Sequence, residues 1–512
     1  MRCLPAPAVR VTLLVSLSLT LCGPDVLGGP FEYSPAEKET LRRYAKDTWH
    51  SLTAMTLSGG LPADGLCRDR AGDWRPSYHT SPTNVAAYLW SILAAERLRL
   101  VGAEEADRRL EETLRALSRQ ERDHGFFFNN IDPRTGVRGS LWPDNNAPVR
   151  PFLSTVDNGW LAAALLMVGN TRPAFRARTD ALLAPMDFRF FYEPYDPADP
   201  VKHPGLLRGG YWADTRLPTT FFYRLANTEP RIASYIGIAL GQLPPDHYYR
   251  LRRNRRPEAR QKQTPEGEDR EYLGVTVFEG HYRYRGMRIV PSWGGSMFEA
   301  LMVPLLVPES RWAPRSWGIN HPLYVRAQIE HGLSEAGYGF WGFSPASKPE
   351  GGYESYGVDA IGVDPDGYPS NNDNTPYDPA NPPPRSAYSN GVVTPHASFL
   401  ALPYAPSVAM TNLKALRDRY QIYGLYGFQD SVNVSSGVVS DCVLALDQGM
   451  ILAAIANALC DNAMQRAFCA GRVETAIRPL IAPEAFTAGT SSRVTPGSDS
   501  SGQTQGRTFP VK

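Results

Sequence analysis

The segment NTEPRIASYIGIA, residues 227–239, places a carboxylate at the start of an apolar helix. Asn227 or Thr228 can cap that helix, because a short polar side chain accepts hydrogen bonds from its first free N–H groups. Pro230 suits the first turn, where a proline loses no intrahelical hydrogen bond. The pattern therefore predicts that Glu229 is held at a helix end and not on a long loop.

A second segment, SWGGSMFEALM at residues 292–302, places Glu299 in a similar setting. Glycines and aromatic residues precede this carboxylate, and an apolar run follows it. An unpaired carboxylate in apolar surroundings is costly, so its presence indicates a function or a buried ion pair. Two carboxylates flanking one bond are the usual machinery for cleaving a glycosidic linkage.

Helical periodicity dominates the rest of the chain. Long loops rich in Gly, Pro, Asn, Asp and aromatic residues separate the apolar segments, and residues 271–290 alternate as a small β-hairpin insertion would. We therefore expect an all-α fold, an (α/α)6 toroid of six helical hairpins, with a two-domain helical protein as the alternative. The predicted helices are 36–57, 83–100, 104–121, 155–169, 173–184, 230–241, 296–306, 318–333, 395–405, 407–421, 440–459 and 462–478.

The ends of the chain differ from its middle. Residues 1–28 combine arginines, an apolar run and small residues, as an export signal does, so we expect a secreted or periplasmic protein. Cys22 offers an alternative, a lipid anchor, and no later segment has the length of a membrane span. Residues 29–482 are predicted to form one catalytic domain, and the polar residues 483–512 a disordered tail.

Composition limits the partners. The net charge of +1 argues against nucleic acid or an anionic membrane as a partner, and we expect the basic run at residues 250–260 to be a solvated loop. No phosphate-binding or dinucleotide motif and no zinc-type spacing is present, so no cofactor and no metal are predicted. Residues 371–374 carry oxygen ligands without the spacing of a calcium loop, and we expect them to be solvated.

Four cysteines remain after the predicted signal. In an oxidising compartment they can form one or two disulfides. The sequence makes Cys460 and Cys469 a candidate pair across a short loop, and buried free thiols are the alternative.

Five motifs in succession resemble the glycoamylase-like family, which includes bacterial endo-β-1,2-glucanases and the C-terminal glycosidase domain of cyclic β-1,2-glucan synthases. The resemblance covers residues 40 to 480. It implies an (α/α)6 fold and a glucan partner, with β-1,2 linkages. The motifs are NTEPRIASYIGIALG (227–241), SWGGSMFEALMVPLL (292–306), FWGFSPAS (340–347), VVTPHASFLAL (392–402) and LDQGM (446–450).

The resemblance places Glu229 as the general acid and, in retaining relatives, Glu299 as the nucleophile. In inverting relatives the base is a later acid, for which Asp430, Asp447 and Asp359 are candidates. A general acid must hold its proton near neutral pH, so apolar surroundings or another carboxylate must raise the pKa of Glu229. Asp157, Trp160, Arg231, Trp293, Trp341, Tyr356, Asp359 and His396 are the predicted substrate-binding residues. Among them, the aromatic residues Trp160, Trp293, Trp341 and Tyr356 are the candidates for stacking on sugar rings, with core packing as the alternative.

We therefore predict an exported glycoside hydrolase that cleaves a glucan, with inverting chemistry favoured. A retaining glycosidase or transglycosylase using Glu229 and Glu299 is the first alternative. A glucan-binding envelope protein without activity and a polysaccharide lyase are the others, because one fold hosts several chemistries.

Overall fold

The computed structural model describes residues 31–142, 147–259, 261, 263–363, 378, 380–389 and 391–490. The predicted export signal with Cys22, the loop at 371–374 and the end of the predicted tail, 491–512, lie outside the described residues. Within the described part, no helix has both the length and the apolar character needed to cross a bilayer.

Helices make up most of the core, and their N-terminal signals are local. Ser81, Ser154 and Ser296 each accept a hydrogen bond from the backbone N–H three residues later and so cap the helices that follow. The helices are α1 (Pro35–Met55), α2 (Pro82–Arg97), α3 (Ala103–Arg119), α4 (Thr155–Thr171), α5 (Arg176–Leu183), α6 (Arg231–Ala239), α7 (His247–Arg250), α8 (Met297–Leu301), α9 (Glu309–Trp312), α10 (Trp317–Glu330), α11 (Pro395–Leu400), α12 (Pro406–Arg419), α13 (Ala445–Leu459), α14 (Ala463–Cys469) and α15 (Arg472–Ile481).

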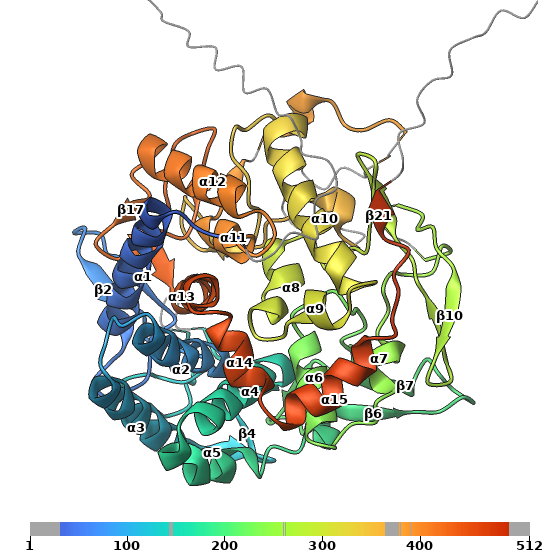
Figure 1. Ribbon diagram of the computed structural model, residues 1–512. Helices are drawn as coiled ribbons and strands as arrows, with labels where there is room; N and C mark the ends of the chain where they lie inside the picture. Colours follow the sequence, from blue (N-terminus) through green and yellow to red (C-terminus); the bar gives the residue numbers. More distant parts are fainter. Residues whose placement is uncertain are drawn as a thin grey trace, which may run out of the picture.

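The helices form an inner and an outer set (Figure 1). In the inner set, α2 packs against α4 and α13, α4 against α6, and α11 against α13 and α8. Outer helices cover them: α1 lies on α13, α3 on α2, α5 on α4, α15 on α6, α10 on α8 and α12 on α11. Inner helices are buried on all sides, which explains why their sequences are apolar all round.

Glycines allow the inner helices to approach closely. A Cβ at Gly159 of α4 would lie 2.8 Å from Cβ of Ala233 in α6, and one at Gly449 of α13 would lie 2.7 Å from Cβ of Ala87 in α2. Real Cβ atoms do not approach this closely, so these two helix contacts require glycine.

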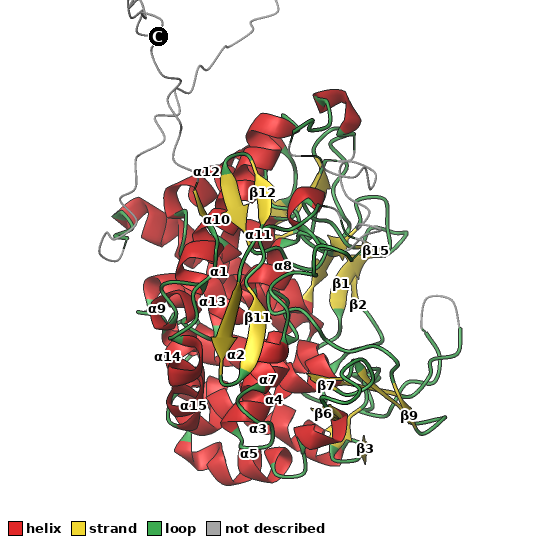
Figure 2. Ribbon diagram, turned by 90° about the vertical axis from the view of Figure 1, so that its right-hand side faces the viewer, coloured by secondary structure: helices red, strands yellow, loops and turns green. Residues whose placement is uncertain are grey.

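Many of the short strands and loops, among them β1, β2, β3, β9 and β15, gather at one end of the helices, on the right of Figure 2, whereas β11 and β12 lie on the side that faces the viewer. The strands are β1 (Gly65–Arg68), β2 (Trp74–Pro76), β3 (Arg122–Asp123), β4 (Phe126–Phe127), β5 (Phe152–Ser154), β6 (Tyr192–Tyr195), β7 (Pro204–Leu207), β8 (Gly210–Trp212), β9 (Leu217–Pro218), β10 (Asp269–Tyr272), β11 (Val275–Phe278), β12 (Tyr282–Tyr284), β13 (Met287–Ile289), β14 (Ala346–Ser347), β15 (Tyr353–Glu354), β16 (Val392–Val393), β17 (Tyr423–Gly424), β18 (Gly427–Phe428), β19 (Val432–Asn433), β20 (Cys442–Leu444) and β21 (Gly489–Thr490). All strand pairs within these sheets are antiparallel.

Several predicted boundaries need correction. The helix predicted at 440–459 begins at Ala445, because Cys442–Leu444 form a strand beside β1. The helix predicted at 462–478 is two helices, and the predicted hairpin at 271–290 is two hairpins, β10–β11 and β12–β13.

The first residues of the predicted disordered tail are part of the fold. Gly489 and Thr490 form β21, which pairs with β13. Glu484 is buried and accepts a hydrogen bond from Nε of Arg253 at 2.6 Å. Arg253 lies inside the basic run that the sequence placed in a solvated loop, so this part of that prediction is wrong as well.

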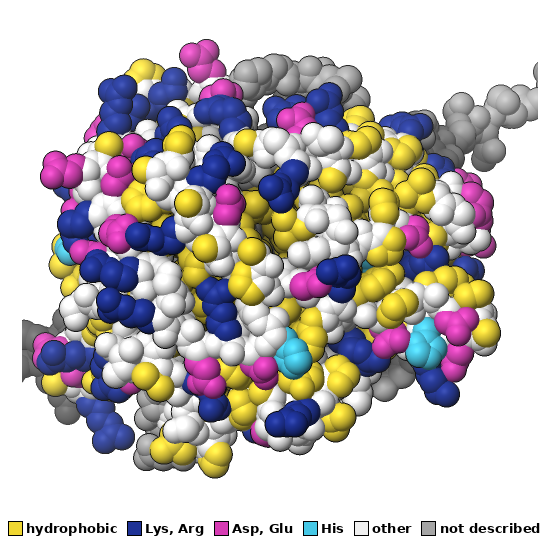
Figure 3. Space-filling view, turned by 90° about the horizontal axis from the view of Figure 1, so that it is seen from below, with side chains coloured by type: hydrophobic (Ala, Val, Ile, Leu, Met, Phe, Trp, Pro, Cys, Tyr) yellow, Lys and Arg dark blue, Asp and Glu magenta, His cyan; other side chains and the backbone are white. Residues whose placement is uncertain are grey.

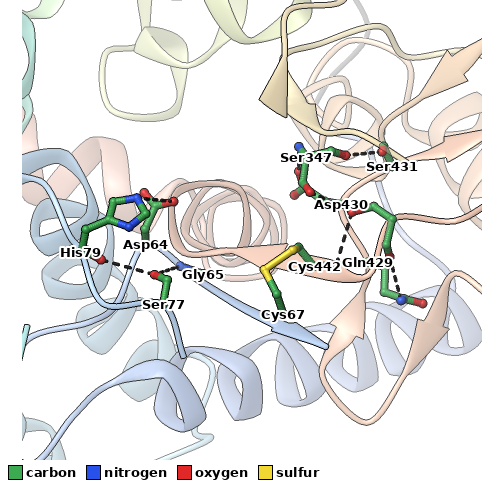
Figure 4. Close-up of a disulfide and its surroundings, with 11 residues drawn as sticks. Asp64, Gly65, Cys67, Ser77, His79, Ser347, Gln429, Asp430, Ser431 and Cys442 are labelled. Atoms are coloured by element: carbon green, nitrogen blue, oxygen red, sulfur yellow. Dashed lines mark hydrogen bonds and ion pairs between the residues drawn. A yellow bond between two sulfur atoms is a disulfide. The ribbon is translucent and has the colours of Figure 1, made fainter. Parts of the chain in front are cut away.

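A disulfide joins Cys67 of β1 to Cys442 of β20 (Figure 4). The two strands pair directly, with Cys67 opposite Cys442 in the register. The predicted Cys460–Cys469 bridge is wrong, since both thiols are free. The sequence could not show the true pair because 375 residues separate its members.

The surface agrees with the small net charge. On the face drawn in Figure 3, acidic and basic side chains are interspersed among polar and apolar ones. That face therefore offers no extended field of a single sign.

Candidate active site

The predicted site residues meet where inner helices begin. Glu229 lies two residues before α6, and Glu299 lies in the first turn of α8. Asp157 and Asp447 occupy the first turns of α4 and α13, and His396 that of α11. The first turn of each helix thus brings a polar side chain to one region, although their positions in the chain lie far apart.

Glu229 and Glu299 are in direct contact. The backbone N–H of Glu229 donates a hydrogen bond to Oε2 of Glu299 at 3.1 Å. The indole N–H of Trp160 donates to Oε2 of Glu229 at 2.7 Å. Both carboxylates are therefore oriented by neighbours on other helices.

The surroundings keep a proton on Glu229. Burial raises the pKa of Glu229 well above its usual value, and the charges of Glu299 and Asp157 add to this, against the opposing hydrogen bond from Trp160. Burial also raises the pKa of Glu299, to about 7, although the N–H of Glu229 and the charge of Arg231 oppose the rise. These effects outweigh the helix dipole, which favours anions at a helix start. At neutral pH, Glu229 therefore keeps its proton, and Glu299 is present in both its protonated and its ionised form.

These acids are not sealed in the core. Glu229, Glu299 and Asp157 are each partly accessible to solvent. Asp157 accepts a hydrogen bond from Oγ1 of Thr83 at 2.6 Å. A ligand that reached this region would therefore meet carboxyl groups at the starts of α4, α6 and α8.

A second cluster joins Asp430, Asp447 and His396, all buried. Nδ1 of His396 lies 3.5 Å from Oδ2 of Asp447, and one donor atom from each of the three lies within 4.8 Å of the others. Burial lowers the pKa of His396 to about 3, so the imidazole is neutral. The backbone N–H of Ser347 donates to Oδ2 of Asp430 at 2.6 Å.

One proton links the two aspartates. Burial, then Asp430 and Asp64, raises the pKa of Asp447 well above its usual value. Burial also raises that of Asp430, to about 6, against hydrogen bonds from Asp447 and Ser347. At neutral pH, Asp447 therefore keeps its proton and donates a hydrogen bond to the ionised Asp430. The three side chains together offer a donor set with the chemistry to hold a divalent cation.

Sequence reasoning missed Asp64. Nδ2 of Asn84 donates to Oδ1 of Asp64 at 2.7 Å, and Nε2 of His79 lies 3.4 Å from its Oδ2 (Figure 4). Although burial opposes it, these partners hold the pKa of Asp64 below its usual value. Asp64 follows no apolar run and no motif, so no signal in the sequence pointed to it.

Two tyrosines were also missed. Burial and the charges of Glu229, Asp157 and Glu299 raise the pKa of Tyr223 well above its usual value. Burial and the charges of Asp447, Asp430, Asp64 and Glu229 raise the pKa of Tyr353 well above its usual value. Both tyrosines lie in segments rich in aromatic residues, where sequence alone could not separate core rings from rings beside the acids.

Arg231 does not line the cavity, so its predicted substrate contact is wrong. Its Nε and Nη2 atoms bind the two oxygens of Glu309 at 2.7 and 3.0 Å, with both side chains fully buried. Tyr235 and His321 bind the same carboxylate. The arginine turns away because its partner comes from α9, beneath the start of α6.

The predicted stacking residues also need correction. Trp160 is buried and acts as the hydrogen-bond donor to Glu229 described above. Trp341 and Tyr356 are buried too, so none of the three offers a ring face to a sugar. Trp293 is half-buried against a small apolar cluster, and Asp359 is buried in a short helical turn.

Comparison with known proteins supports the resemblance. Residues 270–471 match the family model described as "Glycoamylase: Putative glucoamylase", a segment that contains Glu299, Asp430 and Asp447 but not Glu229. The cyclic β-(1,2)-glucan synthase NdvB of Rhizobium meliloti is 23% identical over 589 residues, which cover 87% of this chain and 18% of NdvB. The chain thus spans less than a fifth of the length of that relative.

Solved structures share the fold at low identity. The endo-β-1,2-glucanase of Chitinophaga pinensis, in complex with sophorotriose and glucose, has a TM-score of 0.60 and 16% identity, covering 88% of this chain and 98% of that one. The endo-β-1,2-glucanase of Talaromyces funiculosus, in complex with sophorose, has a TM-score of 0.58 and 13% identity, covering 86% and 89%. The resemblance inferred from the motifs is therefore confirmed: the chain has the fold of the glucoamylase-like glycosidases, and its segment 270–471 matches the glycoamylase family model.

Proposed function

We propose that this protein is an exported glycoside hydrolase that cleaves β-1,2-linked glucan with Glu229 as the proton donor. The observation that carries the proposal is the hydrogen bond that joins Glu229, whose pKa is raised, to the ionisable Glu299, with both side chains partly accessible to solvent. The linkage rests on the matches to proteins named as β-1,2-glucanases and as a cyclic β-1,2-glucan synthase. The helical pairs α1–α13, α3–α2, α5–α4, α15–α6, α10–α8 and α12–α11 support an (α/α)6 toroid as its frame.

Glu229 gives its proton to the glycosidic oxygen as the bond breaks. In the retaining form of the proposal, the Glu299 carboxylate attacks the anomeric carbon and forms a glycosyl-enzyme intermediate. Water then attacks this intermediate while the Glu229 carboxylate takes the proton from the water. This form requires roughly 5–5.5 Å between the two carboxyl groups. The hydrogen bond from the Glu229 backbone to the Glu299 carboxylate keeps the two residues adjacent and is compatible with it.

Inverting hydrolysis is the second form, and the ionised Asp430 favours it. Asp430 would take a proton from water that attacks the face of the sugar opposite Glu229, while Asp447 donates a hydrogen bond to its carboxylate. Inversion requires roughly 6.5–9.5 Å between acid and base, so that the water fits between them.

The first test replaces the proton donor. We expect Glu229→Gln to lower kcat/KM on β-1,2-glucan at least about a hundredfold, as loss of general acid catalysis does, and to keep oligosaccharide binding. The control is Glu474→Gln, which changes an exposed carboxylate on α15. Activity of Glu229→Gln equal to that of the control would refute the assignment. Release of reducing ends only from β-1,3- or α-linked glucans by the wild type would refute the linkage.

The second test separates the two forms. NMR of the first product shows the β-anomer if the configuration is retained and the α-anomer if it is inverted. In the retaining form, azide should restore turnover to Glu299→Ala and yield an α-glucosyl azide. In the inverting form, Asp430→Asn removes the base and should lower activity more than Glu299→Ala does. Binding of glucan without release of reducing ends would indicate a non-catalytic binding protein.

A further inference from the structure

The short hairpin β14–β15 carries a tyrosine, Tyr353, directly after its turn. In its register, Tyr353 lies directly opposite Ser347. The turn between them is closed by the N–H of Lys348, which donates to the carbonyl of Gly352 at 2.8 Å. Gly351 and Gly352 have φ of +94° and +83°, a backbone region that favours glycine, so the turn has a defined shape.

The hairpin is fixed to the second carboxylate cluster through Ser347. Its N–H donates to Asp430 at 2.6 Å, its carbonyl accepts a hydrogen bond from the hydroxyl of Ser431, and its own hydroxyl bonds with that of Ser440 at 3.0 Å (Figure 4). Side chains of directly opposed residues lie on the same face of a hairpin, about 5 Å apart at Cβ. Tyr353 is thus held at a set place relative to Asp430.

The ring of Tyr353 is exposed to water in a setting full of acids. Its exposed fraction is 62%, although Asp447, Asp430, Asp64 and Glu229 all act on its hydroxyl. A side chain this exposed adds little to packing. Its position beside Ser347, which binds Asp430, therefore needs another reason.

We propose that Tyr353 is a substrate-positioning residue, whose ring is the platform on which a glucosyl unit stacks beside the cluster of Asp430, Asp447 and His396. A sugar ring presents C–H groups on its faces, and these pack against the negative face of an aromatic ring, while the phenol hydroxyl stays hydrated. The predicted stacking residues Trp160, Trp341 and Tyr356 are buried, so Tyr353 takes the role that the sequence gave to them. The proposal rests on the proposed glucan-cleaving function.

The test compares Tyr353→Ala with Tyr353→Phe. Loss of the ring should raise KM for β-1,2-glucooligosaccharides about tenfold or more, as loss of one aromatic contact of about 1.4 kcal/mol does, with a smaller change in kcat. The phenylalanine variant should restore KM to within about threefold of the wild type, because it keeps the ring face. Tyr195→Ala is the control, because this exposed tyrosine of β6 packs against Arg250 of α7 and has no contact with either carboxylate cluster among its described contacts.

Calorimetric binding in a Glu229→Gln background separates this proposal from the function itself. Weaker binding of the oligosaccharide by the Tyr353→Ala, Glu229→Gln protein, with normal unfolding temperature, supports the stacking role. Equal binding by both proteins, while the wild type cleaves β-1,2-glucan, overturns the role of Tyr353 alone. A phenylalanine variant as impaired as the alanine variant also overturns it, because the hydroxyl would then be the essential group. A wild type that neither binds nor cleaves β-1,2-glucan overturns the proposed function instead.

Discussion

At the scale of single residues, Glu229 is subject to opposing influences. Burial and the charge of Glu299 favour its protonated form, and the hydrogen bond from Trp160 favours its ionised form. The indole N–H thus orients the acid and limits the rise of its pKa. In the proposed mechanism this balance sets the pH above which the enzyme loses its proton donor.

Replacing Trp160 by phenylalanine tests this balance. The variant loses the donor to Glu229, so the pKa of Glu229 should rise and the basic limb of the kcat/KM profile should move to higher pH. The acid limb, set by Glu299 with a pKa of about 7, should stay, because activity falls as Glu299 becomes protonated. We expect kcat/KM at the optimum to fall about tenfold, since hydrogen bonds to charged groups contribute ~1.5–3 kcal/mol.

Trp90→Phe is the matched control for that experiment. The indole of Trp90 packs edge-on against that of Trp160, but its N–H donates to the carbonyl of Gly449 at 3.0 Å. Loss of the Trp90 indole should lower the free energy of unfolding and leave both limbs of the kcat/KM pH profile in place. A basic limb that does not move in Trp160→Phe would contradict the proposed balance.

Sequence predicted the two glutamates because each stands out in an apolar run. It failed for Arg231, two residues from Glu229, because the partner that removes Arg231 from the cavity is Glu309, 78 residues later. It failed for Asp64 and Tyr353 because their roles arise from neighbours in space that no local pattern records. The sequence therefore predicted residues that stand out among their neighbours in the chain, and it did not predict which distant residues pair in space.

At the scale of elements, the long helices were predictable and the short strands were not. Helices such as α1 and α3 have both a polar face and an apolar face, a strong periodic signal. The strands around the cavity have two to four residues, too few for alternation to show. The β1–β20 pairing, which the Cys67–Cys442 bridge crosslinks, joins two such strands from opposite ends of the chain.

Removing this bridge should destabilise the fold. We expect the double variant Cys67→Ser, Cys442→Ser to lose about 2–4 kcal/mol in urea unfolding, because the crosslink restricts the unfolded chain. Reduced wild type should match the double variant, and Cys460→Ser, which changes a free thiol, should match the oxidised wild type. Identical unfolding midpoints for the double variant and the oxidised wild type would show that the bridge does not stabilise the protein.

At the scale of the whole molecule, the segment after α15 ties the last helix to the two hairpins β10–β13. Glu484 binds Arg253, the hydroxyl of Thr487 lies 2.7 Å from Nδ1 of His281, and β21 extends the β12–β13 hairpin. Polar composition made this segment look like the start of a disordered tail. Composition fails here because a few buried contacts are enough to order a short polar stretch.

Truncation tests how much residues 483–490 contribute to the stability of the fold. A chain ending at residue 482 leaves the buried Arg253 without the hydrogen bonds of Glu484, so that its remaining carboxylate neighbour is Glu279, at 3.9 Å. Removing one partner of a buried ion pair costs about 3–5 kcal/mol, and Glu279 should reduce this loss. A chain ending at residue 490 keeps these contacts and serves as the control. We expect thermal unfolding of the shorter chain at a clearly lower temperature. Equal melting of the two chains would contradict a stabilising role for residues 483–490.

The covalent link between β1 and β20 also changes how the molecule can come apart. It fastens the segment before α2 to the segment before α13, two helices that already pack side by side. Unfolding cannot start by separating β1 from β20, and a protease cut anywhere between the two cysteines leaves both fragments attached. A chain built in this way would keep these two segments joined after a cut, and would release them only when the bridge is reduced.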